Sequence, residues 1–290
     1  MGFDVLSYAI GLQAGKGNGG GSSGGGGALE PGAYFYRPDI KVKNYYQQWA
    51  EYNGEIYSFR NTASGNTDYY TIEKLVDGEW TTVIDSCSLS STQGNMNIMF
   101  LNGKLHFVNN RNHYEFDGAT VTKKSNPVNN IDVGKAAVAD GKLYTYYSSG
   151  QILYEWNESA DTWSGTSLGS GYKGRTLLGC GKDLYLLDDS GNLSRYENGA
   201  LTAVATLNDY YLRWQPIYYN GCIYYASDDY QNKAGKLYKY DIASGAQKLV
   251  GGMLERSSNS KMSVIQNKLF VMYGDGANSA LSPLFMLEVE

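Results

Sequence analysis

The residues best suited to chemistry in this chain are acidic, aromatic and basic side chains that follow strand-like segments. Sugars place their C–H faces on aromatic rings and hydrogen-bond through their hydroxyls to carboxylate and guanidinium groups. Tyrosine and arginine are also frequent anchors of protein interfaces. These residue types therefore suit the binding of a ligand. The candidate ligand-binding residues are Arg60, Arg111, Tyr147, Asp188, Asp189, Tyr210, Tyr211, Arg213, Asp228, Asp229 and Tyr230.

Patterns for catalysis and metal binding are weaker. The chain has two histidines, His106 and His113, and no histidine and cysteine spacing that would hold zinc or copper. His106 falls at an aromatic position of the repeat described below, so we interpret it as a packed ring. No pair of carboxylates is singled out for glycoside hydrolysis, and we interpret acidic segments such as 188–192 as turns rather than calcium sites. We therefore predict no enzyme, no metal and no cofactor.

A repeated turn phrase indicates which elements position the candidate residues. Six copies of a hairpin phrase have their third residue at positions 54, 103, 141, 182, 221 and 267, which is a period of about 40 residues. The dipeptides Asn-Gly and Asp-Gly accept a positive φ at low cost, so they close two-residue hairpins. Apolar residues alternate with polar ones around these turns, as in β-strands, and helix signals are nearly absent after residue 30.

The repeat predicts an all-β fold, a six-bladed β-propeller of four-stranded antiparallel blades. In the second blade we expect strands at 97–101, 104–109, 112–116 and 119–124. The last repeat lacks a fourth strand, whereas Ala33 to Val42 is strand-like and precedes the first blade. We therefore expect this N-terminal strand to close the ring. The 27 tyrosines are expected to pack mainly between blades.

A propeller would bring the candidate residues to one face. The connections between second and third strands share one end of the ring with the connections between blades, and the Asn-Gly turns occupy the other end. We expect the ligand at the end with the longer connections. Trp214 belongs either to that face or to the inner strand of the fifth blade.

One segment carries a family resemblance. Residues 153–163 read Leu-Tyr-Glu-Trp-Asn-Glu-Ser-Ala-Asp-Thr-Trp, which resembles the kelch repeat, where an aromatic-acid pair is followed by a tryptophan. The resemblance extends in degenerate form over residues 33–290. It implies a kelch-like propeller over that range.

The first 32 residues have a different composition from the rest. Residues 1–16 form an apolar peptide, and residues 17–32 form a Gly- and Ser-rich linker with the properties of a flexible coil. The stretch Met-Gly-Phe-Asp-Val-Leu-Ser-Tyr-Ala-Ile-Gly before the glycine run resembles the leader of virion and tail-associated proteins of phages that infect Gram-positive gut bacteria. The resemblance implies a docking peptide, with an inert tail as the alternative. Its candidate docking residues are Phe3, Val5, Leu6, Ile10 and Leu12.

Composition restricts the partners and the compartment. The net charge is −5 without a basic stripe, so we expect no nucleic-acid partner. The leader has no basic residue before Lys16 and is too short to cross a bilayer, so we predict neither a signal peptide nor a transmembrane segment. Three cysteines are an odd number, which favours free thiols over a disulfide framework.

These observations predict a tail-associated structural and adhesion protein of a phage or prophage, assembled in the bacterial cytoplasm and located in the virion. Residues 1–12 would bind other virion or tail proteins, and the propeller would bind a glycan or a protein on the host surface. The first alternative is an intracellular bacterial kelch-like interaction module. The second alternative is a carbohydrate-active enzyme.

Overall fold

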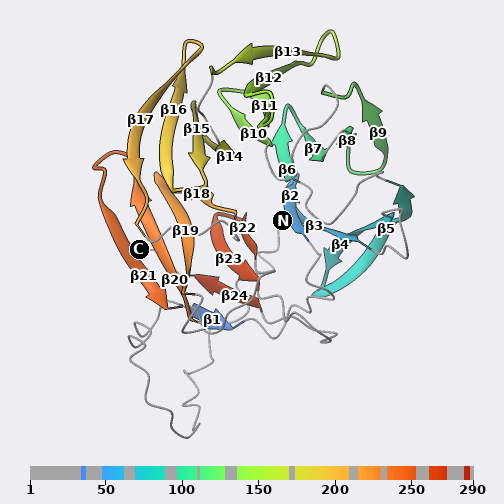
Figure 1. The fold of residues 1–290 in the computed structure, drawn as a ribbon. Coiled ribbons are helices and arrows are strands. Elements are labelled where there is room, and N and C mark those ends of the chain that lie inside the picture. The colour runs from blue at the N-terminus through green and yellow to red at the C-terminus, as the bar shows by residue number, and fades with distance from the viewer. Residues whose placement is uncertain are drawn as a thin grey trace, which may run out of the picture.

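The described part of the chain consists of antiparallel strands and turns. The computed structural model describes residues 34–36, 48–61, 69–88, 97–109, 112–127, 136–169, 174–208, 215–229, 234–252, 261–272 and 284–287. Within these ranges the strands form six four-stranded sheets, which follow one another around a common centre (Figure 1).

Each of the first five sheets contains four strands that are consecutive in the sequence, ordered from the centre outward. The first sheet has β2 (Gln48–Tyr52), β3 (Glu55–Asn61), β4 (Tyr69–Val76) and β5 (Glu79–Ser88), and the second has β6 (Asn97–Leu101), β7 (Lys104–Asn109), β8 (Asn112–Phe116) and β9 (Val121–Lys124). The third has β10 (Ala136–Ala139), β11 (Lys142–Tyr147), β12 (Ile152–Asn157) and β13 (Thr162–Ser167). The fourth has β14 (Gly174–Cys180), β15 (Asp183–Asp188), β16 (Asn192–Glu197) and β17 (Ala200–Thr206), and the fifth has β18 (Ile217–Tyr219), β19 (Cys222–Asp229), β20 (Ala234–Asp241) and β21 (Gln247–Gly252). The remaining sheet has the order β1 (Tyr34–Tyr36), β24 (Leu284–Leu287), β23 (Lys268–Met272) and β22 (Lys261–Ile265).

The first two strands of every sheet are joined by a turn of two residues, as the repeat predicts. In five of these turns both residues have a positive φ, and the first residue has φ between 45° and 51°. Asn, Asp and Gly tolerate this conformation better than other residues. The predicted hairpins are therefore confirmed. The turns are 53–54, 102–103, 140–141, 181–182, 220–221 and 266–267.

The second sheet shows how closely the sequence predicts strand bounds. Its first three strands have the predicted ends, but β9 begins at Val121 and not at Ala119. The reason is a side-chain turn: Oδ1 of Asp117 accepts the backbone N–H groups of Ala119 at 3.0 Å and of Thr120 at 2.7 Å. A carboxylate that binds the next backbone donors in this way delays the start of the strand.

A hydrophobic cluster lies between every two neighbouring sheets. The cluster between the first and second sheets contains Tyr57, Phe59, Phe107 and Phe116, and the other four sequential junctions have clusters of the same kind. Many of the tyrosines on strands are buried in these clusters. The prediction that tyrosine rings pack between blades is confirmed for these residues.

The predicted closure of the ring needs correction. A closing strand over Ala33 to Val42 is not shown, because within that range the structure describes only the three residues of β1, which pair with β24. Pro38 lies inside the predicted range and has no N–H group for a ladder hydrogen bond, so the sequence itself argues against an uninterrupted strand there.

The first and last sheets meet through their inner strands instead. Trp49 of β2 packs against Trp80, with ring centroids 5.3 Å apart, and against Phe270 of β23, with centroids 6.3 Å apart. Beside this aromatic cluster, the backbone N–H of Gln266 donates to Oε2 of Glu51 at 2.7 Å. The buried aromatic cluster makes this junction resemble the other five, and the charge-assisted hydrogen bond of Glu51 adds to it.

Hydrogen bonds between neighbouring turns show that the hairpin turns share one end of the ring. The N–H of Asp140 donates to the carbonyl of Gly181 at 3.0 Å, and the hydroxyl of Tyr219 donates to the carbonyl of Asn267 at 2.6 Å. All second strands therefore start at this end, which we call the turn end. They all finish at the opposite end, which we call the loop end.

Residues 1–33 lie outside the described residues, and so do the predicted leader and linker. No helix in the described ranges is long and apolar enough to cross a membrane.

Candidate functional site

The structure places several predicted ligand residues at the loop end of the ring. Arg60 is the next-to-last residue of β3, and Tyr147 and Asp188 are the last residues of β11 and β15. Asp228 and Asp229 end β19 and pair with Gly235 and Ala234. These positions share one end of the molecule but belong to four different sheets. They form a rim and not a single cluster.

Arg60 is tied to its own sheet. Its Nε donates to Oε2 of Glu73 at 3.3 Å, and the Glu73 side chain is 1% exposed, whereas that of Arg60 is 25% exposed. A buried carboxylate needs a partner of this kind because its desolvation is costly. The pair holds Arg60 at the edge of the loop end and leaves part of its side chain in contact with solvent.

Tyr147 is held by the turn that follows it. A Cβ atom added to Gly150 would lie 2.5 Å from two carbons of the Tyr147 ring. The ring therefore lies directly over the glycine backbone, and a larger residue at position 150 would require the ring to shift. This contact fixes an aromatic face that is half-buried at the loop end.

Asp188 closes a turn. Its Oδ1 accepts the backbone N–H groups of Ser190 and Asn192, each at 2.8 Å, and its Oδ2 accepts Nδ2 of Asn192 at 2.8 Å. The carboxylate thus shapes the connection between β15 and β16, in line with the interpretation of 188–192 as a turn. The neighbouring Asp189 is half-buried.

A hydrogen bond between distant sheets lies at the loop end. Nε2 of Gln215, just before β18 in the fifth sheet, donates to Oδ1 of Asn97 at the start of β6 in the second sheet, at 2.9 Å. Asn97 is 6% exposed. The chain that enters the fifth sheet therefore reaches the inner strand of a sheet that is not its neighbour. The aromatic and basic run 210–214 ends immediately before Gln215 in the sequence.

The remaining predicted site residues cannot be placed. Arg111, Tyr210, Tyr211, Arg213, Trp214 and Tyr230 lie outside the described residues, as do the docking residues Phe3, Val5, Leu6, Ile10 and Leu12.

A second polar cluster, which the sequence did not predict as a site, lies between the second and third sheets. It contains both histidines of the chain. Nδ1 of His106 on β7 and Nε2 of His113 on β8 are 2.9 Å apart, and both side chains are 0% exposed. One ring nitrogen must donate and the other accept, so at least one of the two rings is neutral.

Two tryptophans of the third sheet cover this pair. The Trp156 ring meets both imidazoles edge-on, with centroids 5.2 Å from His106 and 4.6 Å from His113. Trp163 approaches His113 at 5.5 Å, and its Nε1 donates to the carbonyl of Ser125 at 3.0 Å. The histidine pair is therefore part of the contact between two sheets.

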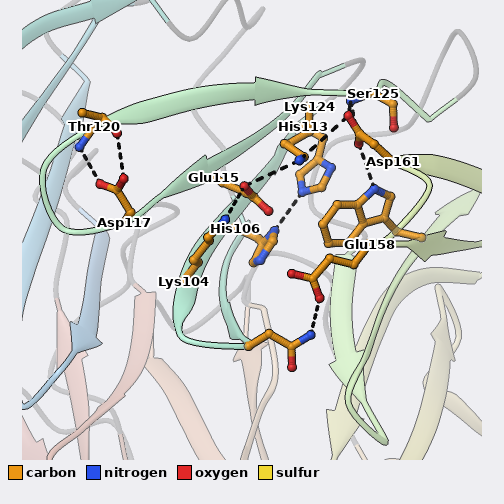
Figure 2. A network of polar contacts seen from close by, with 12 residues as sticks. Lys104, His106, His113, Glu115, Asp117, Thr120, Lys124, Ser125, Glu158 and Asp161 are labelled. Atoms are coloured by element: carbon orange, nitrogen blue, oxygen red, sulfur yellow. Dashed lines mark hydrogen bonds and ion pairs between the residues drawn. The ribbon is translucent and has the colours of Figure 1, made fainter.

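Charged residues surround the buried pair, as Figure 2 shows. Oε2 of Glu115, beside His106, lies 2.9 Å from Nζ of Lys104 and 3.7 Å from Nζ of Lys124. Lys124 also reaches Oδ2 of Asp161 in the third sheet at 3.9 Å and lies over the Trp156 ring, 5.7 Å from its centroid. Asp161 accepts hydrogen bonds from the Ser125 backbone at 3.1 Å and from Nε1 of Trp156 at 3.2 Å.

The environment keeps the histidines neutral near neutral pH. Burial, with a smaller effect of the neighbouring His106, lowers the pKa of His113 from 6.5 to about 3. Burial also lowers the pKa of His106, although Glu115 acts in the opposite direction. Asp161 is charged at this pH: burial alone would raise its pKa, but hydrogen bonds from Ser125 and Trp156 and the charge of Lys124 lower it.

A comparison of the sheets shows what distinguishes this cluster. His106 is a packed ring, as predicted, at the position that tyrosine occupies in the third, fourth and fifth sheets. His113 stands where those sheets carry leucine. The corresponding residues are Tyr144, Tyr185 and Tyr224, and Leu153, Leu193 and Leu237. Aligning the repeats would have shown that both histidines replace other residue types, but only the structure shows the two rings in contact.

The described residues give limited means for covalent chemistry. Within the described ranges, no group of three His, Cys, Asp or Glu side chains lies close enough to hold a metal ion. Cys87, Cys180 and Cys222 are free thiols. Burial raises the pKa of Cys180 to about 12 and that of Cys87 to about 11, so neither is a ready nucleophile.

Comparison with known proteins shows the fold. No family model matches the chain, and no curated protein matches its sequence. Among solved structures, YjhT matches with a TM-score of 0.60 at 11% identity, over 87% of this chain and 95% of its own. A virginiamycin B lyase from Staphylococcus aureus, solved with quinupristin, matches with a TM-score of 0.57 at 12% identity, over 88% of this chain and 100% of its own. YCF48 from Cyanidioschyzon merolae matches with a TM-score of 0.52 at 12% identity, over 88% of this chain and 98% of its own.

The sheet arrangement and these likenesses together define the protein as a β-propeller. At such low identity the likenesses show the fold alone, and proteins with one fold can have unrelated functions. The kelch resemblance and the phage resemblance of the leader stay predictions.

Proposed function

We propose that this β-propeller is a binding module of a phage or prophage tail-associated virion protein, and that its loop end recognises a ligand on the host surface. A glycan is the expected class of ligand. The leader at residues 1–12 would attach the chain to other tail proteins, an expectation that rests on its sequence resemblance.

The observation that carries the binding role is the difference between the two ends of the ring. The turn end is closed by two-residue turns with positive φ, which present little side-chain surface. At the loop end, Arg60 and Tyr147 keep part of their side chains accessible, each held by its own sheet. The connections that start there are also longer, such as 62–68 and 207–216. Binding residues commonly lie on connections of this kind, which a rigid scaffold positions.

Replacing Tyr210 and Tyr230 together by alanine is expected to weaken binding to host cells or their surface glycans at least tenfold, which is about 1.4 kcal/mol. The reason is the loss of two aromatic rings that are expected, from their positions in the sequence, to belong to the binding surface. Binding is measured by surface plasmon resonance with the full chain and purified cell-wall polysaccharide. Asn53→Gly is the control at the turn end, because glycine accepts the φ of 51° found there. It should bind like the wild type.

Equal binding by the double tyrosine variant and the wild type would move the site away from these residues. Mass spectrometry of purified particles tests the virion assignment separately. Absence of the chain from particles would favour an intracellular interaction module, and hydrolysis of a polysaccharide during the binding assay would favour a carbohydrate-active enzyme.

A further inference from the structure

The buried histidine pair has no counterpart in the sheets that follow. Both histidines of the 290-residue chain meet at one junction. The corresponding positions in the next three sheets carry a tyrosine and a leucine, which do not titrate in acid. The second and third sheets are therefore joined by rings that can take up protons in acid.

The pair can accept protons in two steps. Two neutral imidazoles share one hydrogen bond, since each has one donor and one acceptor nitrogen. The first proton places a charge in a region from which water is excluded, although the bond can persist. The second proton makes all four nitrogens donors, so the 2.9 Å contact between Nδ1 of His106 and Nε2 of His113 can no longer be a hydrogen bond.

The charged groups around the pair do not remove the energetic cost of charging the buried imidazoles. From the same sheet, Glu115 favours a charged imidazole, whereas Lys104 and Lys124 oppose it. From the third sheet, Glu158 and Asp161 favour it. Glu115 and Asp161 are already engaged by the lysines. The rings that cover the histidines, Trp156 and Trp163, carry no ionisable group.

We propose that the His106–His113 pair is an acid-sensitive junction, where proton uptake loosens the contact between the second and third sheets while the other junctions stay closed. His113 is the second residue of β8 and follows Arg111, a predicted ligand residue, by two positions, so the junction lies at the base of one connection of the loop end. The proposal stands without the ligand, because it concerns the stability of the ring.

The sign of the effect follows from the direction of the pKa shifts. Both histidine pKa values are lowered in the folded protein, and that of His113 falls from 6.5 to about 3. The stabilisation is therefore complete above pH 6.5 and is lost as the pH falls toward 3, because the unfolded chain binds protons that the folded chain does not. The pKa values of Asp117, Asp161 and Asp241 are lowered from 3.8, so carboxylates add to the loss mainly below about pH 4.5.

Three measurements test the proposal. Nuclear magnetic resonance of the full chain should show two imidazole spin systems, and both should stay neutral through pH 6.5. Urea denaturation measures the equilibrium constant of unfolding. Between pH 6.5 and about 4.5 this constant should rise, for each histidine, by up to tenfold per unit of falling pH. Amide exchange, corrected for its intrinsic pH dependence, should increase first in β7, β8 and β12.

The matched variant replaces both histidines by the residues that the third sheet carries, His106→Tyr with His113→Leu. Between pH 6.5 and about 4.5, the fold change in the unfolding constant of this variant should be at least tenfold smaller than that of the wild type. Tyr144→Phe, at the same position of the third sheet, should keep the wild-type pH profile. Titration of either imidazole near pH 6.5 in the folded wild type would overturn the proposal, whether or not the double variant folds. So would equal pH profiles of the wild type and the double variant.

Discussion

Gly179→Ala is expected to destabilise the ring by about 3 kcal/mol or more, a large effect for a single methyl group. A Cβ atom at position 179 would lie 1.8 Å from the carbonyl oxygen of Val138 and 2.7 Å from its carbonyl carbon. These atoms belong to the backbone of β10, so no side chain can rotate to make room. Moving β10 away from β14 would also strain the hydrogen bond from Asp140 to Gly181 two residues further on.

Thermal unfolding measures this effect, with an expected fall in Tm of roughly 6–12 °C for a domain of this size. The control is Gly165→Ala in the outer strand β13, where the atoms nearest to an added Cβ are side-chain carbons of Ile152 at 2.8 Å and of Tyr154 at 2.8 Å and 3.1 Å. Side-chain ends can shift, so a smaller loss is expected there. Similar Tm values for Gly179→Ala and the wild type would show that the third and fourth sheets do not approach each other as described.

Trp156→Ala is expected to lower the free energy of unfolding by about 3–5 kcal/mol, the usual cost of removing a large buried ring. Trp156 is 4% exposed and covers both histidines, and its Nε1 donates to Asp161. Its loss would leave a cavity between the second and third sheets and would remove the ring under Lys124.

Urea denaturation of Trp156→Ala and Trp156→Phe separates packing from hydrogen bonding. Phenylalanine keeps most of the ring but cannot donate to Asp161, so Trp156→Phe should cost about 1 kcal/mol beyond the change in ring size. A loss below about 1 kcal/mol in Trp156→Ala would mean that the ring is not packed in the junction.

The strands near the hairpin turns could be predicted from the sequence because their signals are local. Asn102 and Gly103 have the positive φ angles that these two residue types accept at low cost, and the alternating residues on either side favour strands. The start of β9 was missed because Asp117 uses its side chain to hold the following backbone. A closing strand over 33–42 is not shown, because the structure describes only Tyr34–Tyr36 of that range, and Pro38 within it has no N–H group for a ladder hydrogen bond.

The contacts of the candidate site could not be predicted in the same way, because they join residues that are far apart in the chain. Asn97 and Gln215 meet only once the sheets are arranged in a ring. The sequence indicated that His106 is a packed ring, but its contact with Trp156 depends on how the second and third sheets face each other. Arg60 was predicted from its position at a strand end, and its buried partner Glu73 was not.

Hydrogen–deuterium exchange of the full chain, with and without cell-wall polysaccharides from Gram-positive bacteria, tests the central claim most directly. A ligand bound at the loop end should slow exchange in peptides that cover 209–214 and 230–233 and leave the turns 53–54 and 102–103 unchanged. Protection confined to the hairpin turns, or no protection by any polysaccharide of the panel, would contradict a glycan-binding role for this end of the propeller.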